Sequence, residues 1–129
     1  MHKFQTRVYY ENTDAAGIVY HADYLCFAER ARTEMLRDAG FEHAKLKEET
    51  GIAFAVRNLS ISYDRAAKLD DALTVTTEIT KLTPVRMFMA QNIYHDDILL
   101  TQLTLELVCI NQHNQATRLP KIVIDKFKS

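Results

Sequence analysis

A short acidic loop near the N-terminus holds the residues whose types best suit chemistry. Asp14 follows a strand-like run and stands among small residues, just ahead of a long helical pattern. The first turn of a helix offers unpaired N–H groups and the positive end of its dipole. An electron-rich oxygen of a ligand could therefore lie there, with the carboxylate beside it. Gly17 belongs to the same loop, and Tyr10 and His21 flank it.

Each of these residues also has an ordinary structural interpretation. An aspartate ahead of a helix often serves as a cap or a turn residue. His21 also suits a helix start or the surface, and Tyr10 suits a packing position with a hydrated hydroxyl group. The residue types alone leave both interpretations open.

A long helix, expected from Asp23 to Ala39, must position this loop. Apolar residues recur along it at helical spacing. The expected buried stripe comprises Tyr24, Leu25, Phe27, Ala28, Ala31, Met35, Leu36 and Ala39. Asp23 is a candidate N-cap, and Gly40 suits the position just after the helix. A second, short helix is expected from Glu42 to Thr50.

After Gly51 the hydrophobic pattern changes from helical to alternating, which predicts strands. The expected strands, including the N-terminal one, span residues 4–10, 57–63, 73–80, 85–95 and 98–110. A polar loop follows at 111–117, and then a terminal helix at 120–128 with Pro120 in its first turn. Short connections favour antiparallel pairing. The order predicts an α+β fold in which one long helix is wrapped by a curved antiparallel five-stranded sheet.

The bulk composition fits one domain over residues 1–129. With 16 basic and 17 acidic residues, the net charge of −1 gives no argument for binding nucleic acid or an anionic membrane. No stretch resembles a signal peptide or a transmembrane segment. Cys26 and Cys109 lie in apolar patterns, so both are expected to be reduced, buried thiols of a cytoplasmic protein.

Several common chemistries lack their sequence patterns. The five histidines show no metal-binding spacing. Three glycines cannot build a dinucleotide fingerprint or a phosphate-binding loop. No G-x-S-x-G motif supports a serine hydrolase. The sequence therefore leaves the Asp14 loop as its main candidate site.

The spacing of residues 7–24 is more specific than any single residue in it. Arg7-Val8, Thr13-Asp14, Gly17-Ile18-Val19 and Tyr24 resemble the signature of the 4-hydroxybenzoyl-CoA thioesterase family. The tracts YYENTDAAGIVYHADY and ERARTE are similar, more closely, to the YbgC-type acyl-CoA thioesterases linked to the Tol–Pal system. The likeness continues through residues 67–71 and 119–121, so it covers nearly the whole chain.

This resemblance implies the hotdog fold and hydrolysis of an acyl-CoA thioester without a metal or prosthetic group. It implies that Asp14 is the catalytic carboxylate and that N–H groups around Gly17 to His21 polarise the thioester carbonyl. Whether Asp14 is a general base or a nucleophile stays open. His21 would orient Asp14 or contact the carbonyl, and Tyr10 is a further candidate.

The resemblance also implies a homodimer in which the strand near residues 54–63 pairs with its copy, with dimers of dimers forming a homotetramer. Such pairing would protect an exposed sheet edge. The phosphates of CoA need cations near the cleft, and the candidates are Arg86, Lys68, Arg57, Lys81 and Arg118. Phe54, Met87 and Met89 are candidates for the acyl pocket, although each also suits core packing.

Two positions depart from the family pattern. Asn12 stands where relatives often carry a second acid, and Ala16 where they often carry glycine.

Two other functions remain open. One is a different hotdog enzyme, such as a dehydratase, acting on acyl-CoA or acyl-carrier-protein thioesters, although only His21 lies near the motif to serve it. The other is a non-catalytic interaction module, which would have no need of Asp14.

Overall fold

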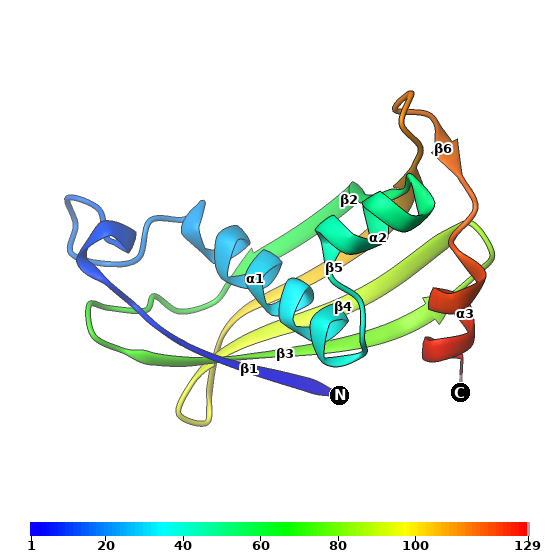
Figure 1. Ribbon diagram of the computed structural model, residues 1–129. Coiled ribbons are helices and arrows are strands. Elements are labelled where there is room, and N and C mark those ends of the chain that lie inside the picture. Colours follow the sequence, from blue (N-terminus) through cyan, green and yellow to red (C-terminus); the bar gives the residue numbers. More distant parts are fainter. Residues whose placement is uncertain (129) are drawn as a thin grey trace.

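The computed structural model describes residues 1–128 and shows an antiparallel sheet built around one long helix (Figure 1). The elements are β1 (His2–Arg7), the 3₁₀ segment η1 (Tyr10–Asn12), α1 (Asp23–Asp38), α2 (His43–Thr50), β2 (Ala53–Tyr63), β3 (Ala72–Leu82), β4 (Arg86–His95), β5 (Ile98–Ile110), β6 (Ala116–Thr117) and α3 (Lys121–Phe127). None of these helices has the length and apolar character that crossing a bilayer requires.

The sheet has the strand order β1-β3-β4-β5-β2, and the two-residue β6 pairs with β5. Every pairing is antiparallel. Helix α1 lies across one face of the curved sheet (Figure 1). The predicted α+β architecture, with five principal strands around one long helix, is confirmed. Strands β1 and β2 form its two edges.

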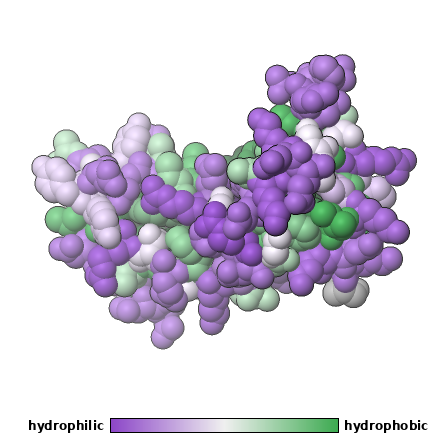
Figure 2. Space-filling view, viewed as in Figure 1, coloured by the Kyte–Doolittle hydropathy of each residue, from purple (hydrophilic) through white to green (hydrophobic). Residues whose placement is uncertain are grey.

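The buried stripe of α1 joins the helix to the sheet. Tyr24, Phe27 and Ala31 pack in one apolar cluster near the start of α1. Met35 and Leu36 pack in a second cluster toward its end. The predicted stripe is confirmed at these positions, but the prediction for Leu25 is wrong because its side chain is exposed. On the surface viewed in Figure 2, hydrophilic residues predominate and apolar ones are scattered.

The first strand ends earlier than predicted, at Arg7 rather than at residue 10. The chain then turns into η1, where the Asn12 side chain forms a local hydrogen bond and strand pairing ends. The Tyr9 N–H donates to Asn12 Oδ1 at 2.8 Å. The N-cap prediction for Asp23 is also wrong, because Ala22 is the N-cap and Asp23 is the first residue of α1.

The sequence pattern missed β6. Ala116 and Thr117 are too few to show an alternating pattern, and polar residues precede them. Asn111 Oδ1 accepts the N–H groups of His113 and Gln115, which closes a turn and returns the chain to β5. The terminal helix is confirmed, except that Pro120 is its N-cap rather than a residue of its first turn.

The two cysteines differ in environment. Cys109 is buried in the core, and burial raises the pKa of its thiol to about 11. Cys26 is exposed on α1, so the prediction that both thiols are buried is wrong for Cys26. The apolar pattern around Cys26 belongs to its helical neighbours and not to the cysteine itself.

We therefore expect one thiol per chain to react rapidly with an aromatic disulfide reagent at pH 8. Cys109 is slow because it is both shielded and protonated at that pH. Cys26→Ser should remove the rapid phase, and Cys109→Ala should leave it. A rapid phase that persists in Cys26→Ser under native conditions would contradict this assignment.

Candidate functional site

Asp14 lies in a tight turn that leads from η1 toward α1. Its N–H donates to the Ile18 carbonyl at 2.9 Å, and the Gly17 N–H donates to the Asp14 carbonyl at 3.0 Å. The side-chain Oδ1 of Asp14 accepts the Ala16 N–H at 2.9 Å. Gly17 has a φ of +80°, a conformation that a side chain would strain. The turn therefore holds the Asp14 carboxylate in a defined position that is open to solvent.

The chain between this turn and α1 is anchored to two other segments. The Val19 N–H donates to the Ala67 carbonyl, and the Ala67 N–H donates to the Tyr24 hydroxyl, both at 2.9 Å. Burial raises the pKa of this tyrosine. The Tyr63 hydroxyl donates to the His21 carbonyl at 2.9 Å. The start of α1 is thus fixed against the end of β2.

Free backbone donors lie at this end of α1. Among the described residues, no hydrogen bond is made by the N–H groups of His21, Ala22 and Tyr24. Unpaired N–H groups and the positive end of the dipole favour an oxygen that carries negative charge. Thr13 and Val19 form a bridge across the base of the turn. The structure therefore joins the Asp14 turn directly to a start of α1 that can bind an oxyanion.

The other two residues predicted to take part in catalysis are exposed. The His21 ring lies against Tyr20 and Tyr63, with centroid distances of 4.6 Å and 6.4 Å. Tyr10 is 83% exposed. Among the described residues, neither side chain is hydrogen-bonded to Asp14 in this single chain. Their catalytic roles stay predictions.

Asn12 has a structural role that the sequence did not reveal. It is buried, and its Nδ2 donates to Asp23 Oδ2 at 2.9 Å. With the bond from Tyr9, the side chain ties η1 to the first turn of α1. The pairing joins residues far apart in sequence, so no local pattern could have shown it. Asn12 thus stabilises the start of α1 through its bond to Asp23.

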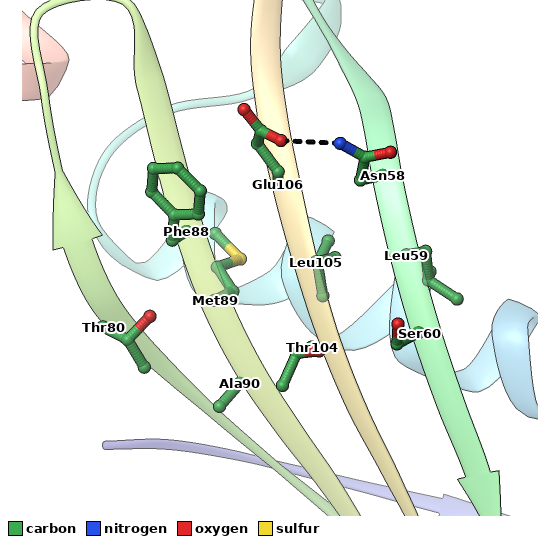
Figure 3. Close-up of a pocket in the computed structure, with 10 residues that line it drawn as sticks. All are labelled: Asn58, Leu59, Ser60, Thr80, Phe88, Met89, Ala90, Thr104, Leu105 and Glu106. Carbon is green, nitrogen blue, oxygen red and sulfur yellow. Dashed lines mark hydrogen bonds between the residues drawn. The ribbon is translucent and has the colours of Figure 1, made fainter.

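Two predicted CoA-binding cations, Arg57 and Arg86, converge on one nearly buried carboxylate. Arg57 Nη1 lies 3.3 Å from Glu106 Oε2, and Arg86 Nη1 pairs with Glu106 Oε1. Asn58 Nδ2 donates to the same Oε2 at 2.9 Å. This bond, followed by the arginines, holds the pKa of Glu106 below its usual range. Figure 3 shows Glu106 and Asn58 on the sheet face opposite α1.

The remaining predicted cations are dispersed. Lys68 lies beside the Asp14 turn, because it forms a bridge with Ile18. The Lys81 ammonium lies 5.7 Å from the centre of the Phe88 ring. Arg118 is exposed near β6. The structure therefore brings one candidate, Lys68, to the turn, and the binding roles of all the cations stay predictions.

The candidates for the acyl pocket differ in how deeply they are buried. Met87 and Met89 are buried in the core cluster at the end of α1, whereas Phe54 is only half-buried on β2. Figure 3 shows Met89 and Phe88 among the side chains lining a hollow of about 240 Å³ on the sheet.

Comparisons with known proteins agree with this architecture. The model of the thioesterase superfamily matches residues 16–102. The acyl-CoA thioesterase YbgC of Haemophilus influenzae is 45% identical over 108 residues, which cover 84% of this chain and 79% of that protein. The acyl-CoA thioester hydrolase YbgC of Escherichia coli O157:H7 is 41% identical over 128 residues, covering 98% and 95%.

Solved structures show the same similarity. The crystal structure of a probable thioesterase from Bartonella henselae superposes with a TM-score of 0.88 at 42% identity. The match covers 92% of this chain and 98% of that one. The hotdog architecture expected from the sequence is confirmed.

Proposed function

Because the chain belongs to the thioesterase superfamily, we propose that it hydrolyses an acyl-CoA thioester with Asp14 as its catalytic carboxylate. The observation that carries the proposal is the joining of the Asp14 turn to the free N–H groups at the start of α1. In acyl transfer a carboxylate can act as base or nucleophile, and an oxyanion-binding helix end can stabilise the transition state.

The geometry suggests a division of roles. The thioester carbonyl oxygen lies against the N–H groups of the segment from His21 to Tyr24, where developing negative charge is stabilised. Asp14 activates water as a general base or attacks the carbonyl carbon to form a mixed anhydride. The CoA thiol is a good leaving group, so no strong acid is needed to release it.

A release assay tests this function and separates it from its alternatives. We expect free thiol to appear when the protein is incubated with short or long acyl-CoA esters. A dehydratase would instead change the acyl chain and leave the thioester intact, and an interaction module would do neither. Parallel assays with acyl-carrier-protein thioesters identify the carrier. The cytoplasmic location, the Tol–Pal link and the binding of an acyl carrier protein remain predictions from the sequence.

The exposed edge of the sheet supports a homodimer. Strand β2 is 11 residues long and pairs only with β5, which leaves its other side without a strand partner in the described chain. Its Val56 side chain is 45% exposed. Natural proteins rarely leave a long strand edge open, because it recruits other strands. Antiparallel pairing of β2 with its copy covers this edge, and a homotetramer would follow from two such dimers.

We expect sedimentation to show a particle of at least twice the 14.9 kDa chain mass. Hydrogen exchange should then be slow at the β2 amides on both sides of the irregularity between Val56 and Asn58, because both edges of the strand are paired. Strand β1 provides the internal comparison, since its outer edge should keep rapidly exchanging amides. A monomer at micromolar concentration, or alternating fast amides along β2, would contradict the dimer.

A further inference from the structure

Arg32 of α1 is a buried arginine that forms no salt bridge among the described residues. It is 9% exposed, and no ion pair to it occurs among the described residues. Its Nη1 donates to the buried Gln91 Oε1 at 2.9 Å. Burial lowers the pKa of the guanidinium, yet an arginine stays charged at neutral pH. A buried charge without a counter-ion is unfavourable and asks for an explanation.

The remaining N–H groups of Arg32 reach an open cleft. Among the described buried side-chain atoms, only His2 Nδ1 and Thr101 Oγ1 are both sealed from solvent and unpartnered. The unpaired nitrogens of Arg32 must therefore contact solvent. Arg32 lines a cleft of about 190 Å³. The other lining residues are Glu29, Leu36, His43, Phe54, Val56 and Leu107.

The proposed dimer places this cleft opposite a second copy's catalytic turn. Phe54 and Val56 line the cleft at the start of β2, whereas Tyr63, at its end, holds the His21 segment. Within one chain these two ends of the strand are roughly 25 Å apart. Antiparallel pairing of two β2 strands brings the start of each beside the end of the other. The cleft therefore faces the partner's α1 start.

We propose that this cleft receives the far end of the acyl group and that Arg32 binds a carboxylate there, so that the substrate is a short dicarboxylic acyl-CoA. This inference rests on the proposed function and its dimer. A guanidinium with free N–H groups binds carboxylates in a bidentate manner. The apolar side chains of Leu36, Phe54 and Leu107 surround the methylene groups.

The cleft of the single chain has room for a short acyl end. A cavity of about 150 Å³ holds a benzene molecule, so 190 Å³ accommodates a few more atoms than a ring. A four-carbon diacid such as succinate fits this space. Glu29 competes with the substrate carboxylate for Arg32, because the charge of Glu29 is close enough to raise the pKa of the guanidinium. Glu29→Gln should therefore strengthen binding of the carboxylate.

The test compares succinyl-CoA with butyryl-CoA, which share a four-carbon chain and differ in the terminal carboxylate. We expect kcat/KM of the native protein to favour succinyl-CoA by about tenfold, after correction for spontaneous hydrolysis. Arg32→Lys should reduce this ratio to near one, because an ammonium group cannot bind the carboxylate in a bidentate manner. Glu29→Gln should raise the ratio. A native ratio of one or below overturns the proposal, even if Arg32→Lys fails to fold.

A binding measurement separates this inference from the proposed function. Calorimetry with free succinate and free butyrate at matched ionic strength requires no hydrolysis. The native protein could bind succinate, lose that binding in Arg32→Lys, and yet hydrolyse no acyl-CoA. That result would uphold the carboxylate site and reject the thioesterase. The opposite outcome is hydrolysis of both esters at similar rates, with no tighter binding of succinate than of butyrate. That outcome would uphold the thioesterase and reject the carboxylate site. A lower melting temperature in Arg32→Lys with an unchanged substrate ratio would identify Arg32 as purely structural.

Discussion

Asp14→Asn should lower kcat on acyl-CoA by about 10²- to 10⁴-fold, because it removes the base or nucleophile and little else. Asparagine has nearly the same shape as aspartate, and its carbonyl oxygen can still accept the Ala16 N–H. The turn that contains Gly17 should therefore remain intact. The substitution separates a catalytic carboxylate from a turn residue, the two interpretations that residue type leaves open.

Glu11→Gln is the matched control for this experiment. Glu11 is another exposed carboxylate of the same region, in η1, and we assign it no role in catalysis. It should leave kcat within a few-fold of the native value. Unfolding midpoints of both variants should match the native protein. An Asp14→Asn enzyme that retains kcat within a few-fold would refute the catalytic assignment, whatever happens in Glu11→Gln.

The fold could be predicted where a single element carries its own periodic pattern. The stripe from Tyr24 to Met35 shows the helix, because every turn of α1 meets the sheet. The alternation in β3 and β5 shows strands with one face in the core. Such patterns come from one uniform environment along a segment. They fail for Leu25 and Cys26, which lie on the helix's outer face although they are apolar.

The candidate site was only partly predictable for a related reason. The Asp14 turn and Gly17 lie within a few residues of each other, so the sequence shows them together. The pairing of Asn12 with Asp23 and that of Arg32 with Gln91 join distant segments. No composition or spacing rule indicates such partners, because they are set by tertiary packing. The association of Arg57 and Arg86 with Glu106 was missed for the same reason.

Gln91→Leu should destabilise the fold by about 3 kcal/mol, the second large effect we expect. Gln91 is fully buried, and its Oε1 is the acceptor for Arg32 Nη1. Its Nε2 donates to the Ala28 carbonyl and to Thr77 Oγ1, at 2.9 Å and 3.0 Å. Leucine fills a similar volume but makes none of these bonds. The substitution therefore leaves a buried charged donor unpaired. This destabilises the fold more than the loss of an ordinary hydrogen bond does.

Thr101→Val is the matched control, because it removes a buried polar group that has no partner. Thr101 is fully buried in β5, and its hydroxyl makes no hydrogen bond among the described residues. Replacing an unsatisfied hydroxyl by a methyl group of similar size should be neutral or stabilising. Urea unfolding at equal protein concentration measures both changes, since a dimer's stability depends on concentration. If Gln91→Leu and Thr101→Val differ by less than about 0.5 kcal/mol, Gln91 does not hold the Arg32 guanidinium in place.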